Sequence, residues 1–372
     1  MADAVRRTIT TAGRMHNHPT AYQPRSKLKQ VFLLVGALVL LAALIGGYYA
    51  YWRDVAQQLQ AGVEAWAEQQ RALGNEVAFD WDGISGFPFR FAATFRDPAI
   101  RWHAPRGDVA WKGGTLRAEM APWNLRRIEI NSTDQHDASL RLLGDGSEWR
   151  LAATGLAGTI DLHGSGALRG FTVALQQPDL TLPNGTPLSS AGATIALDQP
   201  EIPPTDFNMP LGRVALDVRN MALPPGTRLL TEDPVETLSI DATIKGPMPL
   251  APLKDALAAW RDVGGVVDLQ RFAFAQGPLG LTGNATLALD PDLQPEGAGT
   301  VTSTGLGEAI EILIRDGLIP PDHALAARAT VKALEKPGPD GKLQATIGLS
   351  LQNRTVSFGP VPLFALQPIV WP

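Results

Sequence analysis

The chain contains no cysteine among its 372 residues. This absence excludes disulfide bonds, thiolate metal sites and a cysteine nucleophile. It is compatible with an oxidising compartment, although proteins of reducing compartments can lack cysteine as well.

Common catalytic motifs are also missing. The sequence has no phosphate-binding loop, no glycine-rich dinucleotide fingerprint and no Gly-x-Ser-x-Gly nucleophile elbow. The nearest match to the elbow, His163-Gly164-Ser165-Gly166, has a different spacing and a strand-and-turn context. Asp134, His136 and Asp137 could hold a metal, but a solvated turn is preferred because zinc sites normally use more nitrogen or sulfur ligands. The sequence therefore predicts no catalytic, cofactor-binding or metal residue, no cofactor, and a protein that is not an enzyme.

Positive charge is scarce outside the N-terminus. The net charge of the chain is −5, divided between +5 in residues 1–30 and −10 in the remainder. The acidic body argues against a nucleic-acid partner, since phosphate binding needs a basic face. Lysine and arginine beside a membrane span hold that end in the cytoplasm. We therefore expect residues 1–30 to be a cytoplasmic tail and the body to lie on the far side, which in a bacterium is the periplasm.

Residues Val31–Tyr51 form an apolar run without a charged residue. As a helix its 21 positions would span about 31 Å, close to the thickness of the hydrocarbon core of a bilayer. The alternative is a cleaved signal peptide. The run is about twice as long as a signal-peptide core, and it ends in aromatic residues (Tyr48, Tyr49, Tyr51 and Trp52) typical of a membrane interface. These features favour an uncleaved, single-pass inner-membrane anchor.

After the span the hydrophobic periodicity changes. Residues 52–75 have helical spacing and a Gly74-Asn75 end, which predicts a stalk helix packing against the body. From Val77 apolar residues alternate with polar ones, which indicates antiparallel strands with one dry and one wet face. The clearest alternating runs are 89–96, 193–197, 214–218, 238–244 and 343–351. The 37 glycines and 30 prolines fit many strands joined by tight turns.

Three segments resemble one another: Phe95–Gly107, Leu175–Gly185 and Asp217–Gly226. Each reads as a strand, a kink near a proline or asparagine, two alternating apolar residues and a Pro-x-Gly turn. Such a repeat implies stacked hairpins of one design. Three loose copies could also have arisen by chance.

The C-terminal third adds helices. One is expected around Leu250–Trp260, with Pro252 in its first turn, and another over Leu306–Asp316. A hairpin-like stretch, Val266–Asp290, lies between them. The predicted fold is therefore α+β and β-dominated: a transmembrane helix and a stalk helix, then large curved antiparallel sheets with two or three packing helices in the C-terminal third. The predicted segments are 1–30 (tail), 31–51 (span), 52–75 (stalk), 76–248 (antiparallel β domain) and 249–372 (α+β domain continuing the sheet).

The segment around Trp81-Asp82-Gly83 and Gly86-Phe87-Pro88-Phe89-Arg90 is dense in glycine and aromatic residues. It could be a binding corner. A tight turn entering the first strand is the preferred interpretation, with Gly83 and Gly86 shaping the backbone and Phe89 starting the core.

Three stretches carry a resemblance to a known family. Phe79–Phe91 resembles the Gly-x-Pro-Phe-Arg turn of the alphaproteobacterial DUF2125 family, and Ala259–Gly297 and Asp340–Trp371 resemble its later signatures. The family is uncharacterised, so the resemblance implies a single-anchor envelope protein and no catalytic residues. The general arrangement is also similar to AsmA-like envelope proteins, which are thought to carry lipids along β-sheet grooves. This second likeness is an analogy of fold alone.

A sheet with one apolar face must cover that face with a second sheet, a helix or a ligand. Closure as a sandwich would favour a structural or assembly scaffold of the envelope that docks a protein partner. A curved trough would favour binding or transfer of phospholipid or another hydrophobe. An enzyme is the third and least supported hypothesis.

Overall fold

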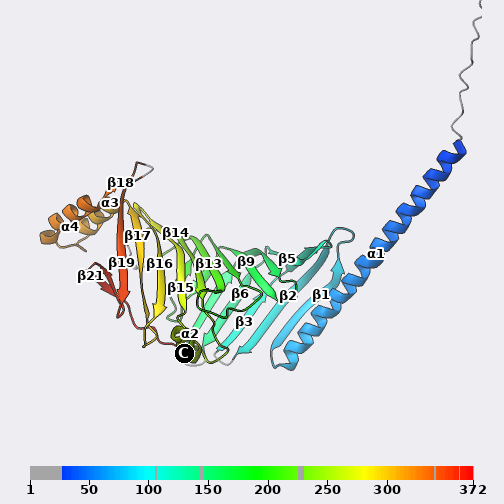
Figure 1. Ribbon diagram of the computed structural model, residues 1–372, viewed down its shortest axis with the longest axis horizontal. Coiled ribbons are helices and arrows are strands. Elements are labelled where there is room, and N and C mark those ends of the chain that lie inside the picture. The colour runs from blue at the N-terminus through cyan, green and yellow to red at the C-terminus, as the bar shows by residue number, and fades with distance from the viewer. Residues whose placement is uncertain are drawn as a thin grey trace, which may run out of the picture. The chain divides into compact units, whose positions relative to one another are not determined.

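The computed structural model describes residues 27–104, 107–142, 146–224, 230–338, 341–359 and 361–371. The predicted tail lies outside these residues except for its last four. The chain divides into two compact units, with the boundary between Arg53 and Asp54. Figure 1 shows the elements in chain order.

The first helix is continuous. α1 spans Lys27–Ala72, so the predicted membrane span and stalk form one helix, and Gly74 follows it with φ of +86°. Residues Val31–Ala72 form the one helix in the described part of the chain that is long and apolar enough to cross a membrane. This confirms the expected candidate anchor.

Within the second unit, α1 lies along the first strand, β1 (Glu76–Ser85). The Arg71 Nε donates a hydrogen bond to the carbonyl oxygen of Val77 at 2.9 Å, and Gln60 lies against Gly83. The most buried residues of α1 in this unit are Ala56 and Ala67, whereas the larger Leu59, Val63 and Trp66 are half-buried or exposed. Small side chains let the helix approach the strand closely.

The strands form one antiparallel sheet in which most neighbours in sequence are also neighbours in space. Those of the first half after β1 are β2 (Phe91–Ala104), β3 (Gly107–Gly113), β4 (Leu116–Ala121), β5 (Asn124–Ser132), β6 (His136–Leu142), β7 (Glu148–Ala153), β8 (Gly155–Leu162), β9 (Leu168–Gln176), β10 (Asp179–Thr181), β11 (Pro187–Ser189), β12 (Gly192–Asp198) and β13 (Pro210–Met221). Those of the second half are β14 (Val235–Lys245), β15 (Val266–Gln276), β16 (Leu279–Leu289), β17 (Pro295–Thr304), β18 (Lys336–Pro337), β19 (Leu343–Gln352), β20 (Thr355–Phe358) and β21 (Val361–Ala365).

Several consecutive strands are halves of one longer strand. β3 and β4 both pair with β2, while β6 pairs with β3 and β5 pairs with β4. The same holds for β7 with β8, β9 with β10, and β11 with β12. The interruptions line up across the sheet, and we call this line the crease. It separates a flap (β3, β6, β7, β10, β11 and the adjoining halves of β1 and β2) from the main sheet.

The crease explains the internal repeat. Asp97, Gln177 and Asn220 lie at the kinks of the three similar segments, and all three have positive φ, of 46°, 44° and 49°. A left-handed residue interrupts the strand alternation and bends the chain. The repeat is therefore the sequence signature of strands that cross the crease.

Three helices lie at the ends of the strands (Figure 1). α2 (Leu253–Asp262) joins β14 to β15, and its Trp260 donates an indole hydrogen bond to the carbonyl oxygen of Lys245 at 2.7 Å. α3 (Leu306–Arg315) and α4 (Pro321–Leu334) pack together at the opposite strand ends, against β16 and β19.

The predicted fold class is confirmed, including three helices in the last third. The expected boundary at 248/249 falls between β14 and α2, and β14 pairs directly with β15 across it. One residue was misplaced: Phe89 lies in the turn between β1 and β2 and is 70% exposed, so it does not start the core. Gly83 and Gly86 do shape this turn, with φ of 82° and 100°.

Candidate functional site

An unbroken row of apolar residues crosses twelve strands of the sheet. Residues directly opposite one another on paired strands point to the same face. The row follows from the pairing register and consists of Ala93, Ala118, Ile130, Gly158, Val173, Ile195, Leu216, Ile240, Phe272, Gly283, Val301 and Ile347. With strands about 4.8 Å apart, the row extends roughly 50 Å when followed from strand to strand.

Two parallel rows widen this surface, which we call the apolar face. One consists of Ile128, Ile160, Phe171, Leu197, Val214, Ala242, Leu269, Ala285, Gly299 and Leu349. The other runs from Leu156 through Leu175, Ala193, Val218, Leu238, Phe274 and Leu281. The corresponding row on the opposite face is mostly polar, with Ala157, Ala174 and Ala273 between Asn131, Thr194, Asp217, Ser239, Thr282, Thr302 and Thr346.

Members of the first row are only partly covered. Ala93 is buried, and the other eleven are half-buried. In a closed sandwich the inner faces of two sheets interdigitate and their residues are buried. The helices do not supply that cover, because α2 lies at one end of the strands and α3 and α4 at the other (Figure 1). The apolar face is therefore accessible to a ligand.

An apolar pocket of about 160 Å³ lies on this face between β15 and β20. Its walls include Phe272, Leu287 and Val301. Gly283, Gly297 and Gly299 stand where neighbouring positions carry side chains, and a Cβ at any of them would clash with backbone of the paired strand. The missing side chains create the hollow, whose volume matches that of an apolar cavity able to hold a benzene-sized group.

The flap continues the apolar face across the crease. Its row consists of Val77, Ile100, Trp111, Ala138, Leu151 and Leu180. The rings of Phe79, Trp81 and Phe95 join the two parts, with centroids of Trp81 and Phe95 5.5 Å apart and nearly parallel. At the crease, Ser132, His136 and Ala153 on the apolar side are buried, whereas Thr154 and Gln177 are exposed. The sheet is therefore bent toward its apolar side along the crease.

The three residues considered as a metal site do not converge on one point. Asp134 Oδ2 accepts a hydrogen bond from the Thr115 backbone N–H at 2.6 Å, which lowers the pKa of Asp134. His136 is 4% exposed and stacks on Trp111, and no described residue hydrogen-bonds either ring nitrogen. Asp137 pairs with Lys112 at 3.5 Å on the other face of the sheet. Their roles are a loop cap, a packed ring and a surface ion pair.

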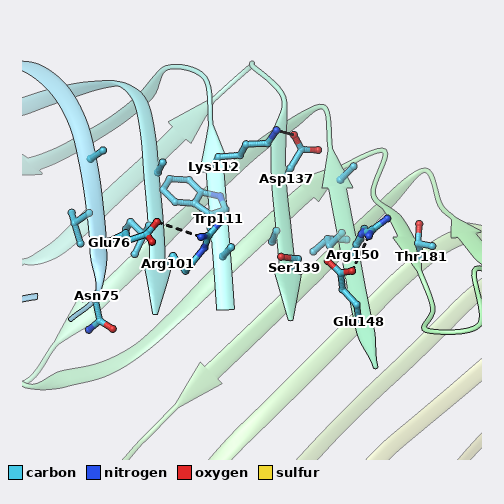
Figure 2. A pocket seen from close by; sticks show the side chains of 18 of the residues that line it. Asn75, Glu76, Arg101, Trp111, Lys112, Asp137, Ser139, Glu148, Arg150 and Thr181 are labelled. Carbon is cyan, nitrogen blue, oxygen red and sulfur yellow. Dashed lines mark hydrogen bonds and ion pairs between the residues drawn. The ribbon is translucent and has the colours of Figure 1, made fainter. Parts of the chain in front are cut away.

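The flap carries a groove of about 1130 Å³, whose lining mixes apolar residues such as Ile100, Trp111 and Leu151 with charged ones (Figure 2). The charged residues form exposed ion pairs: Arg101 with Glu76 at 3.5 Å, Lys112 with Asp137 at 3.5 Å, and Arg150 with Glu148 at 2.7 Å. Positive and negative side chains alternate across the strands and neutralise each other. The groove has no concentration of one charge that would select a charged ligand.

The motif nearest to a nucleophile elbow lies in the turn between β8 and β9. The Nε2 of His163 lies 3.0 Å from the carbonyl oxygen of Gln199, and its Nδ1 lies 4.0 Å from Glu201. Ser165 and Gly166 belong to the turn itself, and Gly166 has φ of +85°. The geometry is that of a hairpin tip, as its sequence context indicated.

Comparison with known proteins finds one family. The model of a family described as "Uncharacterized protein conserved in bacteria (DUF2125)" matches residues 52–367. The chain therefore belongs to the DUF2125 family. No curated protein and no solved structure matches the chain, so the likeness to AsmA-like proteins stays a prediction.

Proposed function

We propose that this DUF2125 protein is a single-pass inner-membrane protein whose periplasmic body holds the hydrocarbon chains of a phospholipid or another hydrophobe on its apolar face. The observation that carries the proposal is the row of twelve residues from Ala93 to Ile347, which is apolar in each strand that it crosses and half-buried at every position except the buried Ala93. Monomeric soluble proteins rarely leave a contiguous apolar patch of this extent without a partner.

The membrane supplies the ligand class. The helix Val31–Ala72 has the length and composition of an anchor, and the basic tail favours a cytoplasmic N-terminus. A body tethered in this way remains within a stalk's length of the bilayer surface, where hydrocarbon chains are the abundant apolar molecules.

The energetics suit reversible holding. Each methylene buried against apolar side chains stabilises a bound chain by about 0.8 kcal/mol. A half-buried chain of eight methylenes would gain roughly half of the corresponding 6 kcal/mol, which leaves exchange with the bilayer possible. The open apolar pocket of about 160 Å³ would let one segment of the chain lie deeper among apolar side chains than the rest.

A scaffold function is the second candidate. Phe89 and Trp123 are 70% and 74% exposed on hairpin tips next to paired strands β2 and β4. Exposed aromatic residues are typical anchors of protein interfaces. In this case a partner would bind the tips, and the apolar face would retain no lipid.

The two candidates differ in what the purified protein carries. We expect full-length protein, extracted in mild detergent, to retain lipid that mass spectrometry detects. A photoreactive amino acid at Ile195, on the apolar face, should form lipid adducts after illumination in membranes. The matched control is Thr194, an equally half-buried neighbour on the opposite face of β12. Equal adducts at both positions, or none at Ile195 together with no retained lipid, would contradict lipid binding and favour the scaffold.

A further inference from the structure

Three neighbouring hairpins present their turns at one end of the strands. We call these segments the three tips: residues 86–90 between β1 and β2, residues 122–125 at the start of β5, and residues 163–168 at the start of β9. The pairing places them at the same strand end. β4 ends beside the start of β2, and β8 ends beside the starts of β5 and β9.

The three tips carry large apolar side chains in contact with solvent. Phe89 and Trp123 are 70% and 74% exposed, and Phe87, Leu125 and Leu168 are exposed as well. With strands about 4.8 Å apart, successive tips lie roughly 10 Å from one another. Clustered exposed apolar residues mark a surface that binds a membrane or another protein.

Contacts between the hairpins hold the tips together. The Nη1 of Arg90, in the first tip, lies 3.1 Å from the Oε2 of Glu119, near the end of β4. The guanidinium group of Arg126, which follows the second tip, lies against Gly164 in the third. The three tips therefore form one surface of fixed geometry.

The charge of the tips suits the surface of an anionic bilayer. Arg90 is the one lysine, arginine, aspartate or glutamate in residues 86–90, 122–125 and 163–168. The part of the chain after residue 30 has a net charge of −10, so anionic lipids repel most of its surface. They do not repel tips that lack carboxylates.

The tether enters the second unit at the same strand end. The helix runs antiparallel to β1, with its last turn bonded to the start of the strand and Gln60 against Gly83 near the end of the strand. Asp54, the first residue of the unit, lies six helical residues beyond Gln60, in the direction of the first tip. It follows Tyr51, the last residue of the apolar run, by three residues, which is at most about 10 Å. The chain connection therefore keeps the first tip within reach of the bilayer surface.

From these observations we infer that the three tips contact the membrane that anchors the chain, with Phe89 and Trp123 inserted at its interface. Aromatic side chains are favoured at this depth, where an apolar ring leaves water and polar groups stay beside the lipid headgroups. The contact is a second attachment of the body and fixes which end of its strands faces the bilayer. The inference goes beyond the proposed function, because it requires no ligand on the apolar face.

The absence of cysteine allows a fluorophore to be attached at one chosen position of the full-length protein. Asn124→Cys places it in the second tip, and Thr330→Cys places it at an exposed position of α4, at the opposite strand ends. The labelled protein is reconstituted in vesicles of phosphatidylethanolamine and phosphatidylglycerol, with a spin-labelled phospholipid in both leaflets as the quencher. Since interfacial residues lie about 5–10 Å into the bilayer surface, quenching at Asn124→Cys should exceed that at Thr330→Cys by at least about threefold.

A tip variant tests the two anchors. Phe89→Ser/Trp123→Ser, labelled at Asn124→Cys, should lower the quenching by at least about threefold, because the tips no longer gain from leaving water. The matched control, Leu318→Ser/Leu325→Ser, removes two apolar side chains that are 58% and 78% exposed between and on α3 and α4. It should leave the quenching at Asn124→Cys unchanged. Melting temperatures of both variants should stay within about 2 °C of the wild type, as expected for exposed positions.

The outcomes separate this inference from the proposed function. Equal quenching at Asn124→Cys and Thr330→Cys, or an equal loss in the tip and control variants, would overturn the membrane contact. A photoreactive residue at position 124 that forms one protein adduct and no lipid adduct in intact cells would assign the tips to a protein partner instead. Lipid adducts at Ile195 report on the apolar face alone, so either proposal can fail while the other stands.

Discussion

The imidazole of His136 stacks on the indole of Trp111, with ring centroids 5.8 Å apart and planes inclined by 4°. The pair lies on the apolar side of the crease, where β3 and β6 run side by side. Burial of both imidazole nitrogens without a hydrogen bond costs free energy, and the cost rises steeply for the charged form. Burial at the crease therefore favours the neutral form of this histidine and lowers its pKa.

This arrangement predicts a pH dependence of stability. Burial lowers the pKa of His136 below 6.5, and the charges of Asp134 and Asp137 oppose that shift. As pH falls through about 6.5, the unfolded chain takes up the proton before the folded chain does, so stability is lost from there down to the lower folded pKa. His136→Phe keeps the stacked ring and should reduce the loss of melting temperature between pH 7.5 and 5. His323→Phe, at an exposed position, is the control; an unchanged pH slope for His136→Phe would contradict the assignment.

The crease makes a second prediction at Asn220, whose φ is 49°. A β-branched residue in the left-handed region costs about 1–2 kcal/mol. Asn220→Val should therefore lower the melting temperature of the full chain in detergent, whereas Asn220→Gly should be nearly neutral because glycine adopts this conformation freely. A destabilisation by glycine as large as that by valine would show that the asparagine side chain, not the backbone, is what matters.

The alternation of apolar and polar residues located the strands around Ile195, Leu216 and Ile240, because each strand has one apolar and one polar face. Alternation could not give the register of these strands. The continuous apolar row can be recognised only when the pairing of Ile195 with Leu216 and of Leu216 with Ile240 is known. Alternation also could not show whether the apolar face is covered by other parts of the protein or is accessible to solvent and ligands, since both cases use the same residue types.

Other differences between expectation and structure have local causes. The strand alternation was extended back to Phe89, but Gly86 starts a turn that ends only at Arg90. The two or three helices expected in the C-terminal third were located only at Leu250–Trp260 and Leu306–Asp316, so the position of α4 was missed, because Pro320 and Pro321 interrupt the helical pattern before it. Proline is also favoured in the first turn of a helix, where no N–H bond is lost, and Pro321 begins α4.

A third prediction concerns Gln276, whose side chain is fully buried at the end of β15. Its Oε1 accepts from the Leu230 N–H at 3.1 Å, and its Nε2 donates to the carbonyl oxygens of Thr231 and Asp233 at 3.2 and 2.7 Å. Gln276→Leu removes all three bonds and should destabilise the body by about 3 kcal/mol, roughly 5–10 °C in melting temperature. Gln270→Leu, at an exposed position of the same strand, should change it by less than about 2 °C. Equal effects would argue against a structural role for these bonds.

The last prediction concerns topology. Six lysines and arginines precede the apolar helix against one aspartate, and such a bias retains the basic end in the cytoplasm. Alkaline phosphatase, which folds only outside the cytoplasm, should therefore be active when fused after Pro372. Replacing Arg25, Lys27 and Lys29 with glutamate should lower this activity, because the charge bias beside the helix is reversed. The intact mass of the purified protein should include residues 1–30. A mass that begins after Trp52 would show cleavage and contradict a permanent anchor, while an inactive but stable fusion would contradict a periplasmic body.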